Sequence, residues 1–331
     1  MKALVTGGGG FLGKAIVKQL LEQGWEVRSL SRGDYPELRD LGVETLQGDI
    51  SDPLQVDPAV EGVDIVFHVA AKAGVWGDFN DYYKANVLGT KNTLEACLRF
   101  GVPRYVYTST PSVVYGDDSL EGVDESTPYP ETFLTAYAET KAEAEKMVLG
   151  ADQDKIKTVA LRPHLIWGPG DNHLVPRIVD RAQRGKLKKI GDGKALVDSV
   201  YVDDAARAHL LAADALEETG APSGKAYFIS QDEPMAIGDL IDLILTSAGL
   251  EPITAQVPEK VAYGVGWTLE TVYKLLNKRE EPLMTRFVAK QLATAHYFDI
   301  SAAKRDFGYA PQRTIAEGMV PLGDWIRSEL L

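Results

Sequence analysis

The 331-residue chain holds 48 acidic and 35 basic residues, which gives a net charge of -13 at pH 7, and 45% of its residues are hydrophobic. This apolar content supports a packed core, and no basic stripe is present, so no nucleic-acid partner is expected. The single cysteine, Cys97, cannot form an internal disulfide, and no leader pattern precedes the first apolar run. A reducing, cytoplasmic location is therefore expected.

Strand-like and helix-like runs alternate along the first half of the chain. Runs typical of strands cover residues 2–6, 26–30, 43–46, 63–69, 104–108 and 158–162. Helical patterns cover residues 11–23, 82–100 and 134–149. This alternation predicts an α/β fold, a Rossmann-type doubly wound parallel sheet with crossover helices.

The pattern of expected elements changes after Pro163, where glycines and prolines separate shorter strands and helices. We expect a Rossmann domain over residues 1–163 and a smaller substrate-binding or lid region over residues 164–331 that shares elements with the first. The most apolar run covers residues 261–276, but Glu270 and Lys274 interrupt it. No membrane-spanning helix is expected there, although this run suits contact with a membrane surface or a greasy substrate.

A glycine-rich segment, Thr6-Gly-Gly-Gly-Gly-Phe-Leu-Gly13, joins the first expected strand to the first expected helix. Gly7, Gly10 and Gly13 are spaced three apart, and Phe11 and Leu12 open the helix. Glycines allow a tight turn and a close approach of backbone N–H groups to a pyrophosphate, which the helix N-terminus also favours. The segment therefore predicts a dinucleotide-binding loop.

The end of the second expected strand indicates which dinucleotide binds. The chain reads Ser31-Arg32 where an NAD enzyme of this fold carries an acidic residue for the ribose 2'-hydroxyl. Ser31 and Arg32 can instead bind a 2'-phosphate, which favours NADP(H), while a solvent-exposed Arg32 at the start of a loop stays open as an alternative. Asp49 and Ile50 follow the third strand, where the carboxylate can meet the adenine amino group.

Tyr137 and Lys141 lie four residues apart in a helical pattern, so their side chains share one face. A nearby ammonium stabilises phenolate, which suits Tyr137 to proton transfer. Thr110, and Ser109 as second choice, follow the strand over residues 104–108 and can hold a substrate carbonyl oxygen. Because Tyr-x3-Lys pairs are common by chance, a surface contact stays open as the alternative.

Together these motifs resemble the extended short-chain dehydrogenases/reductases over nearly the whole chain. The segments 107–110, 161–170, 174–176 and 224–234 resemble the 3β-hydroxysteroid dehydrogenase branch. Within it, Ala71-Lys-Ala-Gly-Val-Trp-Gly77 and Thr108-Ser-Thr-Pro-Ser112 are similar to bacterial 2-alkyl-3-oxoalkanoate reductases of olefin biosynthesis.

That resemblance implies roles for single residues. Tyr137 becomes the proton donor, Lys141 binds the nicotinamide ribose and tunes Tyr137, and Thr110 occupies a position that usually holds serine. Asn86 matches an amide that braces strands beside the site. The resemblance also implies cofactor contacts for two further residues, Ala70 and Pro163.

The resemblance implies a reversible reduction of a 2-alkyl-3-oxoalkanoic acid with long acyl chains. Lys72 is our hypothesis for binding the substrate carboxylate. A helical face is expected to cover either the acyl chains or the core, and it comprises Val261, Val265, Leu269, Val272, Leu275 and Leu276. The five histidines show no metal-ligand spacing, so no metal is expected. Implied partners are a second copy of the chain or other enzymes of the pathway.

Three alternatives stay open. A 3β-hydroxysteroid dehydrogenase acting on a 4-carboxysterol uses the same chemistry, because its substrate also carries a hydroxyl β to a carboxylate. A sugar-nucleotide epimerase or dehydratase shares the fold but keeps NAD bound, and the missing acid after the second strand disfavours it. A non-enzymatic NADP(H)-sensing regulator has no need for Tyr137, Lys141 and Thr110 together.

Overall fold

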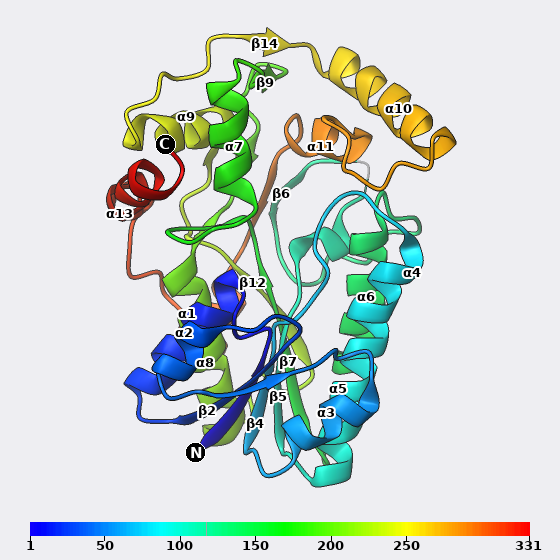
Figure 1. The fold of residues 1–331 in the computed structure, drawn as a ribbon, viewed down its shortest axis with the longest axis vertical. Helices are drawn as coiled ribbons and strands as arrows, with labels where there is room; N and C mark the ends of the chain where they lie inside the picture. Colours follow the sequence, from blue (N-terminus) through cyan, green and yellow to red (C-terminus); the bar gives the residue numbers. More distant parts are fainter. Residues whose placement is uncertain (117) are drawn as a thin grey trace.

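A computed structural model describes residues 1–116 and 118–331, and a seven-stranded parallel sheet forms its centre (Figure 1). The strands follow the spatial order β3 (Glu44–Gln47), β2 (Glu26–Ser31), β1 (Lys2–Thr6), β4 (Ile65–His68), β5 (Arg104–Thr108), β7 (Lys157–Pro163) and β12 (Lys225–Ile229). The predicted doubly wound sheet is confirmed. The order reverses direction between β1 and β4, which is where such folds bind ligands.

Helices cover both faces of this sheet (Figure 1). One face carries α1 (Phe11–Glu22) and α8 (Val202–Glu218), and the other carries α3 (Pro53–Val60), α5 (Gly89–Phe100) and α6 (Ala136–Leu149). The helix expected over residues 82–100 is divided, since α4 (Phe79–Tyr82) and a π-helical segment, η1 (Tyr83–Leu88), precede α5.

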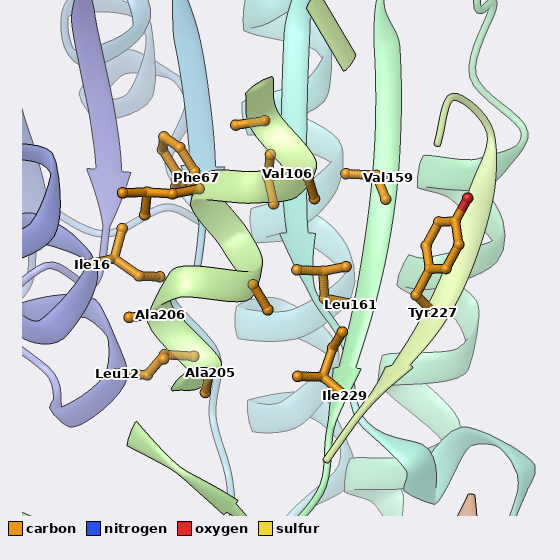
Figure 2. Packing of buried hydrophobic residues seen from close by; sticks show 14 of the residues in the cluster. Leu12, Ile16, Phe67, Val106, Val159, Leu161, Ala205, Ala206, Tyr227 and Ile229 are labelled. Atoms are coloured by element: carbon orange, nitrogen blue, oxygen red, sulfur yellow. The ribbon is translucent and has the colours of Figure 1, made fainter. Parts of the chain in front are cut away.

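The core between α1, α8 and the sheet explains why these helices lie so close to the strands. Leu12 and Ile16 of α1 belong to the same buried cluster as Phe67 of β4 (Figure 2). Ala205 and Ala206 of α8 lie on the side of that helix that faces α1, where their small side chains permit a close approach of the two helices (Figure 2). Burying one large aliphatic or aromatic side chain here contributes about 1.5–3 kcal/mol.

A second hydrophobic core lies beyond the sheet and surrounds the fully buried Trp167. Three helices pack around it, namely α7 (Leu174–Gln183), α9 (Ile237–Ser247) and α13 (Ile315–Glu329). A mixed sheet has the order β13 (Met235–Ala236), β10 (Leu196–Val197), β15 (His296–Phe298) and β6 (Leu120–Val123). The remaining elements are α2 (Pro36–Asp40), η2 (Pro111–Val114), β8 (Ile166–Trp167), β9 (Lys189–Ile190), β11 (Val200–Tyr201), β14 (Gln256–Val257), α10 (Glu259–Leu275), α11 (Arg286–Gln291) and α12 (Ser301–Phe307).

The two expected regions share the central sheet, because α8 and β12 return to it after residue 163. Our division of the chain at residue 163 stays a proposal. Within residues 1–116 and 118–331, no helix has both the length and the apolar character needed to cross a bilayer.

Helix α10 turns its expected apolar face outward. Val261, Val265 and Leu275 are 52%, 46% and 80% exposed, whereas Ala262 and Gly266 on the other side are buried. The expectation that this face closes the core is therefore wrong, while the expectation that it covers acyl chains stays a prediction. The physical reason is close packing on the chain before α11, where a Cβ on Gly266 would come within 2.6 Å of the Thr285 backbone. Only a narrow side of the helix fits there.

Candidate active site

A cleft of about 530 Å³ lies along the carboxyl ends of the sheet strands. It is lined by every residue expected to bind a cofactor, namely Gly7, Gly10, Phe11, Leu12, Gly13, Ser31, Arg32, Asp49, Ile50, Ala70, Lys141 and Pro163. Tyr137, Thr110 and Ser109 line the same cleft. Parallel strands bring their carboxyl ends to one edge, so segments far apart in sequence meet here.

The glycine loop approaches the neighbouring strand so closely that side chains are excluded. Gly7 has a φ of 71°, and a Cβ there would come within 3.0 Å of the Ala70 Cα atom. A Cβ on Gly13 would come within 2.1 Å of the Gly7 carbonyl oxygen. Gly10 caps α1 without a side-chain hydrogen bond, so no side chain competes for its first N–H groups. This loop fits the pyrophosphate of a dinucleotide.

The end of β2 places Ser31 and Arg32 in the cleft without a carboxylate at that position. Tyr35, which the sequence analysis missed, also lines the cleft, and its ring faces Gly9 so closely that a Cβ there would be 2.3 Å away. Asp49 lines the cleft after β3, and its carboxylate accepts a hydrogen bond from the Ser51 N–H at 2.9 Å.

Tyr137 lies in the first turn of α6, which begins after Thr135 because the Thr135 hydroxyl accepts a hydrogen bond from the Ala138 N–H at 3.2 Å. Burial raises the pKa of Tyr137 to about 12, and the neighbouring Thr110 hydroxyl opposes that rise. Tyr137 is thus a neutral phenol at neutral pH, the form that can donate a proton.

Lys141 is buried one turn further along α6. Its Nζ atom donates a hydrogen bond of 2.6 Å to the Thr108 carbonyl and lies 4.0 Å from the centre of the Tyr107 ring. Burial lowers the pKa of Lys141 to about 7, while the negative charge of Glu145 opposes this shift. The structure thus fixes this amine at the end of β5 and places it on the same cleft as Tyr137.

A buried histidine braces the strand end that holds Lys141. The His209 Nδ1 atom lies 2.7 Å from the Ala205 carbonyl, which can only accept, so Nδ1 must carry the proton. The Nε2 atom therefore accepts a hydrogen bond of 2.8 Å from the Thr108 hydroxyl. Burial lowers the pKa of His209 to about 4, so the ring stays neutral at neutral pH.

Asn86 braces the helix that carries Tyr137 and Lys141. Its side-chain oxygen accepts from the Lys72 N–H at 2.7 Å, and its amide donates to the Lys72 carbonyl and the Thr140 hydroxyl. The expected brace is present, although it joins the loop after β4 to α6 instead of two strands.

Thr110 and Ser109 differ in how they present their hydroxyls. The Thr110 Oγ1 atom accepts from the Ser112 N–H at 3.2 Å, which orients it at the start of η2. The Ser109 hydroxyl is buried and finds no hydrogen-bond partner among the residues that the structure describes. Both line the cleft beside Tyr137.

A second cavity of about 210 Å³, which we call the outer cavity, shares Tyr137 with the cleft. Its walls come from the loop after β4, the start of α6, and the α10–α11 pair, and they comprise Val75, Trp76, Gly77, Phe79, Tyr82, Leu134, Thr135, Ala136, Tyr137, Glu270, Lys274, Thr285, Arg286 and Phe287. Sequence reasoning missed this cavity, although Trp76 lies in a motif that the resemblance had singled out. Tyr137 therefore has open space on two sides.

The carboxylate of Glu270 is buried at the wall of the outer cavity and is matched by Arg286. It accepts hydrogen bonds from the Arg286 backbone N–H at 2.7 Å and from its guanidinium at 2.8 Å. This pair ties α10 to α11. Glu270, which the sequence analysis treated as an interruption of an apolar run, therefore lies on the buried side of α10 and holds that helix against α11.

Lys72, expected to bind a substrate carboxylate, lines neither cavity. Its amine pairs with Asp81 at 3.0 Å and lies 5.1 Å from the centre of the Tyr82 ring. The structure therefore does not bring Lys72 to Tyr137. Among residues 1–116 and 118–331, no three His, Cys, Asp or Glu side chains are grouped to hold a metal.

The sequence model of the 3-beta hydroxysteroid dehydrogenase/isomerase family matches residues 4–258, which include every segment that builds the cleft. The chain belongs to this family. The resemblance predicted from the motifs is thereby confirmed, and the chain is an oxidoreductase of the extended short-chain dehydrogenase/reductase type.

Two bacterial relatives match this family member over most of its length. A 2-alkyl-3-oxoalkanoate reductase of Shewanella oneidensis is 54% identical over 96% of this chain and 84% of its own. A 2-alkyl-3-oxoalkanoate reductase of Stenotrophomonas maltophilia is 49% identical over 96% and 97%. Among solved structures, MoeE5 in complex with UDP-glucose and NAD superimposes with a TM-score of 0.76 at 25% identity and covers all of both chains.

Proposed function

We propose that this protein is an NADP(H)-dependent reductase of 2-alkyl-3-oxoalkanoic acids and catalyses the reversible formation of the 2-alkyl-3-hydroxyalkanoic acids. The observation that carries this proposal is the meeting of Tyr137, Thr110 and Lys141 in one cleft beside the glycine loop. The two reductases that are 54% and 49% identical support the substrate class.

Tyr137, Thr110 and Lys141 have different roles in the proposed reaction. When bound, the nicotinamide supplies a hydride to the β carbon, or accepts it in the reverse reaction. Tyr137 donates its phenolic proton to the carbonyl oxygen that gains negative charge, and Thr110 donates a hydrogen bond to the same oxygen. Lys141, held by the Thr108 carbonyl, is positioned for the nicotinamide ribose and lowers the cost of forming phenolate.

The choice of NADP(H) over NAD(H) rests on the end of β2. Ser31 and Arg32 line the cleft there, and a guanidinium paired with a 2'-phosphate forms a strong charge-assisted hydrogen bond. The nearby Asp34 carboxylate is engaged by Arg39, so it is not free to take the ribose hydroxyl.

The sterol reading remains the second candidate, because the matching family is named for hydroxysteroids and the same residues would serve its chemistry. The alternatives of an NAD-retaining epimerase and of a cofactor-sensing regulator lack a comparable observation. The cytoplasmic location, contact with a membrane surface, and a second copy or pathway enzymes as partners stay predictions.

The test is turnover by the purified protein of a long-chain 2-alkyl-3-hydroxyalkanoic acid with NADP+ or NAD+, followed through the absorbance of the reduced nicotinamide. We expect turnover with the alkyl acid and a higher kcat/KM for NADP+. Turnover of a 4-carboxysterol without turnover of the alkyl acid would select the sterol candidate, and a preference for NAD+ would contradict the cofactor assignment.

A further inference from the structure

The outer cavity contains a cationic side chain next to aromatic walls, and the proposed reaction gives this cation no role. Lys274 and Arg286 are the cationic residues among the described residues that line it. Arg286 is engaged by the Glu270 carboxylate. The Lys274 amine lies 5.9 Å from the centre of the Trp76 ring, and no ion pair joins it to any of the described residues.

Lys274 is an exposed residue of α10, and the Trp76 ring beside its amine is held by several contacts. The Trp76 indole N–H donates to the Lys278 carbonyl at 3.3 Å, and its ring meets Tyr273 edge-on at 6.3 Å. Tyr82 donates its hydroxyl proton to the Trp76 carbonyl at 2.9 Å. The contacts with Tyr273 and Lys278 tie the loop after β4 to the end of α10 and the residues that follow it, and they place the indole face next to the Lys274 amine, where an ammonium is favoured.

The shape of the proposed substrate requires an anion site close to Tyr137. In a 3-oxoalkanoic acid only one carbon separates the carboxylate carbon from the carbonyl carbon, so an oxygen held by Tyr137 brings the carboxylate within a few ångströms. The cleft side of Tyr137 offers Lys141, which is held by the Thr108 carbonyl, and Arg32, which belongs to the adenosine end. A carboxylate left unpaired among aromatic walls would be strongly disfavoured.

We propose that Lys274 binds the substrate carboxylate in the outer cavity, beside an alkyl arm that packs against Trp76 and Phe287, and so determines the preference for acids. This inference rests on the proposed function for its substrate class. It replaces Lys72, whose amine is paired with Asp81, by a cation that shares a cavity with Tyr137.

The kinetic test compares a long-chain 2-alkyl-3-hydroxyalkanoic acid with its methyl ester, which has the same shape but no charge. In Lys274→Met we expect the KM for the acid to rise about tenfold with little change in kcat, because a hydrogen bond to a charged group is lost. The KM for the ester should not change, and Lys274→Arg should restore most of the acid binding.

Lys260→Met is the matched control, because it removes the same charge from an exposed position of α10 that lines neither cavity. It should leave the KM for the acid unaltered. An equal effect of Lys274→Met on acid and ester, or no effect on the acid, would overturn the inference. A rise in the acid KM in Lys72→Met, with none in Lys274→Met, would return the carboxylate to Lys72.

Calorimetry separates this inference from the proposed function. A 2-alkylalkanoic acid without the 3-hydroxyl cannot react, so its binding can be measured whether or not the protein turns over the hydroxy acid. Binding to the wild type that weakens about tenfold in Lys274→Met supports the anion site even if turnover fails. Equal binding to both proteins, or no binding to the wild type, rejects it.

Discussion

The cleft and the outer cavity meet at Tyr137, yet they are built in different ways. The cleft is lined by short segments that follow the sheet strands, and each is held where parallel pairing brings the carboxyl ends together. The outer cavity is closed by the loop after β4, by the start of α6, and by α10 and α11, which lie more than 100 residues further along the chain. One half is a product of sheet topology and the other of packing between distant segments.

Because they are built differently, we expect the cleft and the outer cavity, the two halves of the site, to bind different ligands. Backbone geometry dominates the cleft, where glycines leave room for a dinucleotide, a ligand that many enzymes of this fold bind. Side chains dominate the outer cavity, where aromatic residues and the ion pair between buried Glu270 and half-buried Arg286 shape the space. We therefore expect changes in each half to affect one ligand, and changes at Tyr137 to affect the chemistry that joins them.

The largest effect is expected from Tyr137→Phe, which removes the proposed proton donor where the two cavities meet. Turnover should fall by about 10²–10⁴-fold, because general acid catalysis contributes that much. The KM for the acid should change little. Steady-state kinetics and the Kd of NADPH, measured by its fluorescence, check this expectation.

Tyr83→Phe is the matched control for that variant. Tyr83 opens η1 and lines neither cavity, so its phenyl replacement should keep wild-type kcat. If Tyr137→Phe retained more than about a tenth of the wild-type kcat, another group would have to supply the proton.

The sequence predicted the cleft far better than the outer cavity, and the reason is physical. A glycine spacing, a Tyr-x3-Lys pair and hydroxyls after a strand are local patterns, and the parallel sheet then forces Gly7, Thr110 and Tyr137 together. Local sequence did not reveal that Lys72 pairs with Asp81 and lines neither cavity, so its position lends no support to the expected contact with the substrate carboxylate. The apolar face of α10 was misplaced because Gly266 and Glu270, and not the valines, form its contact with α11.

Gly266→Ala should damage the outer cavity alone. A Cβ there would come within 2.6 Å of the Thr285 backbone, so α10 must shift, and such overpacking costs about 1–3 kcal/mol. We expect the KM for the acid to rise about tenfold while the Kd of NADPH stays constant.

Gly264→Ala tests whether that effect comes from the contact instead of from the new methyl group. Gly264 lies on the same helix, and a Cβ there would meet nothing within 4 Å. This variant should bind the acid normally. A loss of NADPH affinity in Gly266→Ala would argue against separate halves.

Arg32→Ala is the counterpart in the cleft of Gly266→Ala in the outer cavity. Removing the guanidinium should raise the KM for NADP+ about tenfold and leave the KM for NAD+ and the acid unchanged, since the lost contact is with the 2'-phosphate. Arg99→Ala removes the same charge from an exposed position that lines neither cavity, and it should change neither constant. An equal loss for NADP+ and NAD+ would remove Arg32 from 2'-phosphate recognition.

The smallest expected effect concerns stability, and it comes from Lys141, the buried amine to which we assign a catalytic role. Burial lowers the pKa of Lys141 from 10.5 to about 7, so the folded state binds this proton more weakly than the unfolded state does. Below pH 7 both states carry the proton, and the folded state bears the full free-energy cost of burying a charged amine. Between pH 7 and 10.5 this cost declines as the pH rises, and above pH 10.5 it vanishes.

Lys141→Met removes this cost but also the hydrogen bond to Thr108, so we expect the variant to be more stable by about 1 kcal/mol at pH 6, or roughly 2 °C in Tm. The gain should shrink between pH 7 and 10, as measured by thermal unfolding of wild type and variant across that range. A difference in Tm that is constant over this range would mean that burying the charged Lys141 amine does not destabilise the folded state.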